Sequence, residues 1–181
     1  MRKRTKAVFI FVTFIVFIYA IFAVVETVHL SSKTVEGAFE KFINNDINTE
    51  GVQNEIGDKE FYQNGNYTFV PFVVDDNVSL VQFEKGIFGW KRIYYSHNRN
   101  EGLSYSTVVD ELKGDILIHG VIPKEIVTQT KIIQVNGIDA EIILLNDISG
   151  IWILLDNKIQ GNFGSIQIEF LDEFGNVIAE M

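Results

Sequence analysis

The chain has 181 residues, 24 acidic and 15 basic side chains and a formal net charge of −9, and it contains no cysteine. A surface of that charge repels nucleic acid and anionic lipid headgroups, so electrostatic binding to either is disfavoured. The absence of cysteine excludes a disulfide framework and a lipid attached through an N-terminal cysteine.

The stretch from Ala7 to Val25 has nineteen residues without a charge or a proline, and it directly follows a basic segment. At about 1.5 Å of rise per residue, a helix of this length covers roughly 28 Å, close to the hydrocarbon thickness of a bilayer. The four preceding cations favour a cytoplasmic N-terminus. The sequence therefore predicts a single-pass protein of the cell membrane, with a cytoplasmic tail at 1–6, a transmembrane signal-anchor at 7–25 and an extracytoplasmic C-terminal domain.

Two other interpretations of this apolar stretch remain open. A cleaved signal peptide normally has an apolar core of about 7–15 residues and an A-x-A site, whereas Ala20 and Ala23 are three positions apart. A buried core helix normally has polar positions on one side, whereas this stretch is apolar all round. Both observations favour the uncleaved anchor.

The exterior part begins with a polar linker at 26–33 and a predicted α+β unit at 34–100. The whole exterior part, from residue 26 onward, has 11 basic and 24 acidic side chains and thus a charge of −13. Apolar residues recur at i, i+4, i+7 and i+8 from Val35, which predicts an amphipathic helix from about Thr34 to Asn45. A loop rich in asparagine and glycine follows, with a short strand near Glu60 to Tyr62. An antiparallel meander is then predicted at Tyr67–Val74, Val78–Glu84 and Trp90–Ser96.

A polar break at 96–102 is the predicted boundary to an almost wholly β unit at 101–181. Asn136-Gly137 is the strongest hairpin signal in the chain. The predicted strands are Leu103–Asp110, Ile116–Ile122, Lys131–Val135, Ile138–Leu145, Ile151–Leu155, Ser165–Leu171 and Asn176–Ala179. Short strands with turns at about every 8–12 residues predict an immunoglobulin-like β-sandwich.

Several blocks of the exterior part combine turns, core positions and aromatic residues in a recognisable way. They are Phe83–Lys91, Ile118–Ile122, Val135–Ile143, Ile151-Trp152 and Asp172–Ile178. In these blocks the chain resembles small membrane-anchored or lipid-anchored ectodomains of Gram-positive bacteria, whose activity is uncharacterised. The resemblance implies a location and a fold rather than an activity. Many such proteins have a lipidated cysteine, whereas this chain has an apolar helix.

No residue pattern predicts a metal, a cofactor or a catalytic centre. His29, His97 and His119 fall in unrelated segments without HxH or HExxH spacing, and His119 is interpreted as a satisfied or half-buried strand residue. The acidic turns at 75–77 and 172–173 offer oxygen atoms to calcium, but they lack the spacing of a calcium loop, and turn chemistry explains them. No G-x-S-x-G or S-x-x-K motif supplies a serine nucleophile.

The feature most open to a functional interpretation is the aromatic group Phe88, Trp90, Tyr94 and Tyr95, with Trp152 in the second unit. Exposed aromatic residues stack on sugars or anchor protein partners, although aromatic residues in sheets commonly belong to the core. The sequence predicts a non-enzymatic binding or interaction module whose partner is an envelope protein or a wall glycan. The alternatives are a cell-wall-associated hydrolase with paired carboxylates that meet only in the fold, and a sensor of a small ligand or cation.

Overall fold

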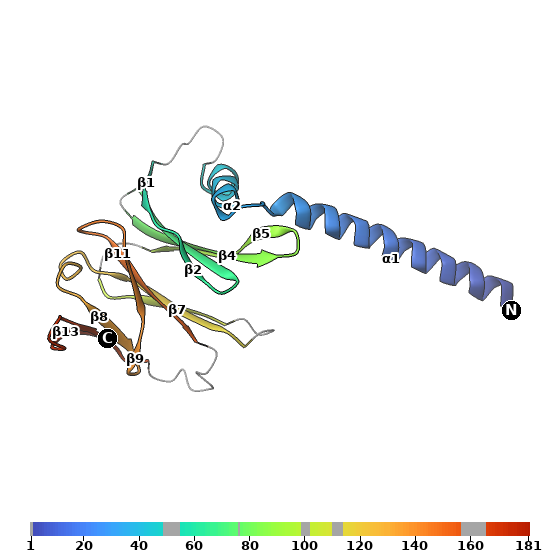
Figure 1. Ribbon diagram of the computed structural model, residues 1–181. Coiled ribbons are helices and arrows are strands. Elements are labelled where there is room, and N and C mark those ends of the chain that lie inside the picture. Colours follow the sequence, from blue (N-terminus) through green and yellow to red (C-terminus); the bar gives the residue numbers. More distant parts are fainter. Residues whose placement is uncertain (1, 49–54, 76, 99–101, 110–113, 157–165) are drawn as a thin grey trace.

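The computed structural model describes residues 2–48, 55–75, 77–98, 102–109, 114–156 and 166–181. One long helix, α1 (Arg2–Leu30), projects from a body made of a short helix and three antiparallel sheets (Figure 1). The short helix, α2 (Val35–Phe42), continues into a turn of π-helix, η1 (Ile43–Ile47). The prediction of an N-terminal apolar helix followed by a mainly β region is confirmed.

Helix α1 is not covered by the body. Its segment Val8–Leu30 is long and apolar enough to cross a membrane, and none of the apolar window is buried against the rest of the chain. The interpretation of this segment as a buried core helix is therefore wrong. The helix continues past the predicted end at Val25, and the hydroxyls of Thr27 and Ser31 donate to the carbonyl oxygens of Ala23 and Thr27, each at 2.7 Å.

Helix α2 begins at a capped end and packs on the first of the three sheets, sheet A, whose strands lie between residues 56 and 98. The Thr34 side chain accepts a hydrogen bond from the Gly37 amide at 3.1 Å, as an N-cap residue does. Phe39 and Phe42 are buried, and both rings lie against Phe72 of the sheet, with centroids 5.3 and 6.1 Å away. The predicted helix is thus present, but its last turn is a π-helix rather than an α-helix.

Sheet A contains the predicted meander, because β3 (Tyr67–Val74), β4 (Asn77–Gly86) and β5 (Gly89–Asn98) pair in chain order. Two further strands, β1 (Ile56–Lys59) and β2 (Tyr62–Asn64), pair with the other side of β3. The one short strand predicted near 60–62 is present only in part, since β2 begins at Tyr62 and residues 60 and 61 separate it from β1. This gap lies opposite Pro71, which has no N–H for a ladder.

Sheets B and C are built from the residues after 104. Sheet B has the order β10-β11-β7-β6, and sheet C has the order β13-β12-β8-β9. The strands of sheet B are β6 (Tyr105–Val109), β7 (Ile116–Ile122), β10 (Glu141–Leu144) and β11 (Gly150–Asp156). Those of sheet C are β8 (Ile132–Val135), β9 (Ile138–Asp139), β12 (Ile168–Leu171) and β13 (Val177–Glu180).

Local details of this region agree with the sequence in part. The Asn136-Gly137 hairpin is confirmed, and both residues have positive φ, 51° and 77°. The single strand predicted at Ile138–Leu145 is wrong, because the chain leaves sheet C at Ala140 and joins sheet B. The predicted boundary at 100–101 and the predicted strand ends at Asp110 and Ser165 lie outside the described residues.

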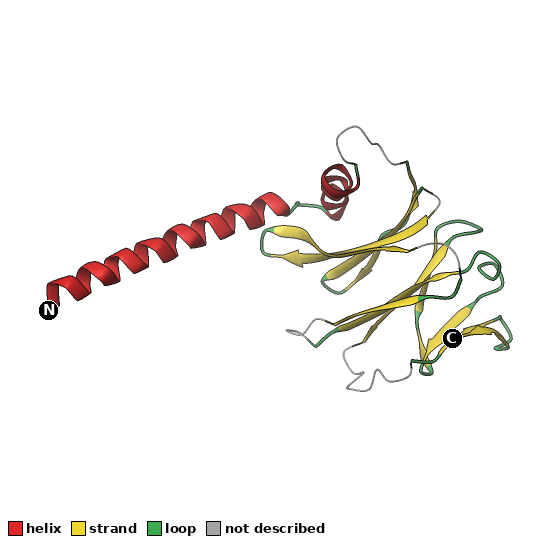
Figure 2. Cartoon of the chain, turned by 180° about the vertical axis from the view of Figure 1, so that it is seen from behind, coloured by secondary structure: helices red, strands yellow, loops and turns green. Residues whose placement is uncertain are grey.

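The body is a stack of four layers: α2, sheet A, sheet B and sheet C (Figures 1 and 2). One buried cluster joins α2 to sheet A, a second joins sheet A to sheet B, and a third joins sheet B to sheet C. Sheet B is therefore covered on both faces, and all seven residues of β7 are buried. The two predicted units, 34–100 and 101–181, share the core between sheets A and B.

Candidate functional site

A cavity of about 280 Å³ lies between sheets A and B, and we call it the inter-sheet pocket. Residues from both sheets line it: Tyr67, Gln82, Ile93, Tyr94, Val108, Val109, Asp115, Leu117 and Leu155. A register shift in β5 shapes this wall, because Gln82 pairs with Tyr94 and Phe83 with Arg92, which leaves Ile93 between them. A bulge of this kind redirects side chains, and both Ile93 and Tyr94 reach the pocket.

Polar groups from both sheets meet in the inter-sheet pocket. The Tyr67 hydroxyl donates to the Asp115 carboxylate at 3.0 Å. Gln82 contributes an amide that is 6% exposed. The Tyr94 hydroxyl is hydrogen-bonded to Nε2 of the buried His119 at 3.1 Å. The pocket therefore presents two phenols, an amide and one carboxylate in an otherwise apolar lining.

His119 is fully buried in the middle of β7. Burial lowers the pKa of its imidazole from 6.5 to about 4, so the ring is neutral at pH 7. Its Nδ1 has no hydrogen-bond partner; among the described residues, the other buried side-chain atoms in that state are Thr68 Oγ1 and Trp152 Nε1. His119 is thus a strand residue as predicted and its Nε2 has a partner, but the residue is fully rather than half buried and its Nδ1 is not satisfied.

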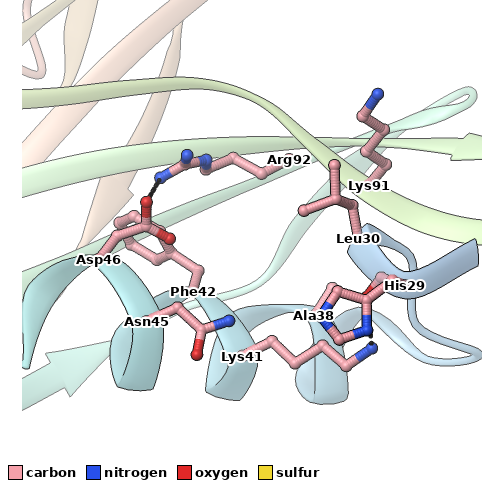
Figure 3. A pocket seen from close by; sticks show the side chains of 9 residues that line it. All are labelled: His29, Leu30, Ala38, Lys41, Phe42, Asn45, Asp46, Lys91 and Arg92. Carbon is pink, nitrogen blue, oxygen red and sulfur yellow. Dashed lines mark hydrogen bonds and ion pairs between the residues drawn. The ribbon is translucent and has the colours of Figure 1, made fainter. Parts of the chain in front are cut away.

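A second cavity, of about 240 Å³, lies where α1 meets the body, and we call it the helix-junction pocket. Its lining residues, shown in Figure 3, are His29, Leu30, Ala38, Lys41, Phe42, Asn45, Asp46, Lys91 and Arg92. Nη1 of Arg92 lies 3.0 Å from Oδ1 of Asp46, and its guanidinium lies 5.0 Å from the centre of the Phe42 ring. Lys41 Nζ donates to the carbonyl oxygens of His29 and Ser31 at 3.2 and 2.7 Å. The pocket is thus rich in cations.

The structure does not bring the predicted aromatic residues together. Phe88 lies in the turn between β4 and β5 and is 40% exposed. Trp90 is buried in the cluster that joins α2 to sheet A, and Trp152 is fully buried between sheets B and C. Tyr94 is the member of the group that lines the inter-sheet pocket. Tyr95 packs on Phe42 and Phe72. The aromatic residues of the β4–β5 hairpin thus point to different sides of sheet A, and Trp152 belongs to sheet B, so they do not form one surface.

Sequence reasoning missed Tyr67, Gln82 and Asp115 as pocket residues. One signal was available, because Gln82 and His119 are polar residues within otherwise apolar, buried strands. A buried polar group needs a hydrogen-bond partner or a cavity that holds one. The pairing of Tyr67 with Asp115 spans 48 positions of the chain, and no local pattern predicts it.

The residues weighed as metal ligands are dispersed. His29 lies at the end of α1, His97 contacts Ser79 at 2.9 Å, and His119 is buried elsewhere. The Asp172 carboxylate accepts hydrogen bonds from the amides of Phe174 and Asn176 and from the Asn176 side chain, and these bonds lower its pKa. Within the described ranges, no group of three or more acidic, histidine or cysteine side chains is placed to hold a metal ion.

Comparison of the chain with protein-family models, with curated proteins and with solved structures gives no match. The resemblance to envelope proteins of Gram-positive bacteria therefore stays a prediction. The candidate sites rest on the geometry of this chain alone.

Proposed function

We propose that the protein is a single-pass membrane protein of the cell envelope, with its basic tail in the cytoplasm and its β body outside. The support is helix α1, whose apolar side chains have no protein cover over Val8–Leu30. Such a surface is unfavourable in water and matches the hydrocarbon core of a bilayer in length and composition. The four cations directly before the apolar stretch favour this orientation.

In this proposal the body is a binding module rather than an enzyme, and its ligand is a sugar unit such as those of wall glycans. The observation that carries it is the lining of the inter-sheet pocket, where two tyrosines, Gln82 and Asp115 meet apolar side chains. Aromatic rings pack on the apolar face of a sugar, while amide and carboxylate groups bond to its hydroxyls. A volume of about 280 Å³ is near the lower end for ligand pockets, which suits one small unit.

We also infer that the region 101–181 is an immunoglobulin-like sandwich. The order β6-β7-β11-β10 corresponds to strands A-B-E-D of that fold, and β13-β12-β8-β9 corresponds to G-F-C with one added edge strand. Two features differ from antibody domains, since the chain has no disulfide and its buried Trp152 lies on the strand that corresponds to E rather than C. Because this architecture supports many functions, the ligand is argued from the pocket and not from the fold.

The alternative of a hydrolase has one observation in its favour. Glu55 and Asp75 both line a cavity of about 490 Å³ beside β1 and β3. Both side chains are exposed, and among the described residues Gly57 and Val73 complete the lining, so this site does not enclose its carboxylates away from water as a glycosidase site does. The sensor alternative uses the same inter-sheet pocket and adds the transmission of binding to α1.

Thermal unfolding of the full chain in detergent micelles tests the proposal, with the disaccharide of N-acetylglucosamine as the probe, of which one unit would enter the pocket and the other would remain outside it. Binding to the folded state stabilises it by about 2.7 kcal/mol at a ligand concentration one hundred times Kd, so we expect Tm to rise with added disaccharide. Gln82→Leu keeps the volume and removes the amide, and it should abolish most of the rise. The exposed Gln63→Leu on β2 is the matched control and should behave like the wild type.

The outcomes of this experiment distinguish sugar binding in the inter-sheet pocket from binding elsewhere and from hydrolysis. An unchanged Tm of the wild-type chain at saturating disaccharide would contradict the sugar-binding proposal. An equal rise in the wild type and in Gln82→Leu would place binding outside the inter-sheet pocket. Release of free N-acetylglucosamine during the incubation would favour the hydrolase.

A further inference from the structure

The turn between β4 and β5 exposes two large apolar side chains, Ile87 and Phe88, which we call the hairpin tip. Ile87 is 93% exposed and Phe88 is 40% exposed. Apolar side chains grouped on a projecting turn indicate an interaction surface. Exposure alone does not identify a partner, because Phe174 in the turn between β12 and β13 is also exposed. The partner of the hairpin tip is therefore inferred from where the tip lies in the molecule.

The hairpin tip lies beside the last turn of α1 (Figures 1 and 2). A cavity of about 260 Å³ is lined by Thr27 from α1, by Ser31 directly after it, and by Ile87 and Phe88 from the tip. The medium that surrounds the end of α1 therefore also surrounds the tip. If α1 crosses a bilayer, the tip lies at the level where the helix leaves the hydrocarbon.

The connection between α1 and the hairpin is short and specific. Ser32 and Trp90 exchange two backbone hydrogen bonds, of 2.9 and 2.7 Å, only two residues after α1 ends. Gly89 has φ +111°, and a Cβ at this position would collide with the Ser32 carbonyl oxygen. Lys41 holds the other side of the junction through the carbonyls of His29 and Ser31. The tip cannot move far from the end of α1 while these contacts persist.

The body is acidic as a whole, but its cations gather at this junction. Lys33, Lys85 and Lys91 are exposed there, and Lys41 and Arg92 line the helix-junction pocket. These are five of the eight lysine and arginine residues in the described part of the body. Acidic side chains are present here too, since Asp46 pairs with Arg92 and Glu84 lines the cavity at the tip, so the repulsion of anionic headgroups expected from the net charge should be weakest at this end.

We propose that the hairpin tip inserts Ile87 and Phe88 into the headgroup boundary of the bilayer that α1 crosses, where Lys85 and Lys91 bind the phosphates of anionic lipids. Apolar side chains next to lysines are the composition of segments that lie in this boundary. The inference rests on the proposed membrane anchoring. It gives the body a second membrane contact and thus one fixed orientation on the bilayer surface.

Because the chain has no cysteine, single cysteines report each position without background. The variants Ile87→Cys, Phe174→Cys and Val16→Cys, each with an NBD label, are placed as full chains in phosphatidylcholine–phosphatidylglycerol nanodiscs that contain a spin-labelled quencher lipid. We expect quenching and a blue-shifted emission for the labels at 87 and 16, and neither for the label at 174. If only the label at 16 is quenched, the anchor stands and the tip proposal is overturned. If the label at 16 is not quenched, the anchor itself is refuted.

Charge reversal tests the role of the lysines. Near an anionic surface each lysine contributes about 1 kcal/mol, so Lys85→Glu with Lys91→Glu should lower the ratio of inserted to free tip by at least about fivefold per site in anionic nanodiscs. Lys124→Glu with Lys131→Glu, both on the distant part of the body, is the matched control and should leave the ratio unchanged. Equal quenching of the label at 87 in both double variants would overturn the proposed lipid contact of Lys85 and Lys91.

Discussion

Burial of His119 between sheets A and B lowers the pKa of its imidazole to about 4, whereas in the unfolded chain the pKa returns to its ordinary value of 6.5. Between these values the unfolded chain binds a proton that the folded chain does not bind. The stability that follows from this difference is fully present above pH 6.5 and is lost as the pH falls toward 4.

At the residue scale we therefore predict a pH dependence that His119→Leu removes. At about 1.36 kcal/mol per pKa unit, His119 alone should lower the free energy of unfolding of the wild type by about 3 kcal/mol between pH 7 and pH 4. Denaturant unfolding of the full chain in micelles at several pH values measures this slope. The exposed His97→Gln should keep the wild-type slope, and an unchanged slope in His119→Leu would refute the assignment.

A second residue-scale prediction concerns Gly89, whose φ of +111° and contact with Ser32 leave no room for a side chain. Gly89→Ala should destabilise the body by about 1–3 kcal/mol, because it adds backbone strain and breaks the Ser32–Trp90 bridge. Hydrogen exchange of the Trp90 amide should accelerate with it. Gly86→Ala, in the same hairpin, is the control, since its nearest contact is an ordinary 3.8 Å. Equal losses in the two variants would contradict this explanation.

At the element scale, the sequence predicts an element well where local pattern alone decides it. The meander, the helix near 35 and the Asn136-Gly137 turn follow from alternation, helical spacing and backbone freedom. The predictions fail where pairing with a strand distant in sequence determines the structure. The strands β1 and β2 form by pairing with the edge of β3. The chain breaks at Ala140 because the residues before it pair in sheet C and those after it pair in sheet B.

The packing of α2 on sheet A gives a prediction at this scale. Phe39 is 2% exposed and its ring lies 5.9 Å from Phe61 and 5.3 Å from Phe72. Phe39→Ala should therefore cost about 3–5 kcal/mol of the free energy of unfolding, as buried aromatic truncations do. Phe174→Ala, at an 81% exposed position, should change it by less than about 0.5 kcal/mol. Similar losses in both variants would show that α2 does not belong to the core.

At the scale of the whole molecule, the stacking of the sheets creates features that could not be predicted from the sequence. The inter-sheet pocket combines residues from 67 to 155, and its existence depends on how sheet A lies on sheet B. The same holds for the cation-rich end of an acidic body, because net charge does not report where the cations lie. The apolar helix, by contrast, could be predicted from the sequence, because its length and composition alone distinguish it.

The orientation of the chain across a membrane is the central claim, and the accessibility of single cysteines in intact cells tests it most directly. Full chains with Phe174→Cys or Lys6→Cys are treated with a membrane-impermeant maleimide before and after permeabilisation. We predict labelling of Phe174→Cys in intact cells, and labelling of Lys6→Cys only after permeabilisation. Labelling of Lys6→Cys but not of Phe174→Cys in intact cells, or recovery of the unlabelled chain in the soluble fraction, would contradict the proposed topology.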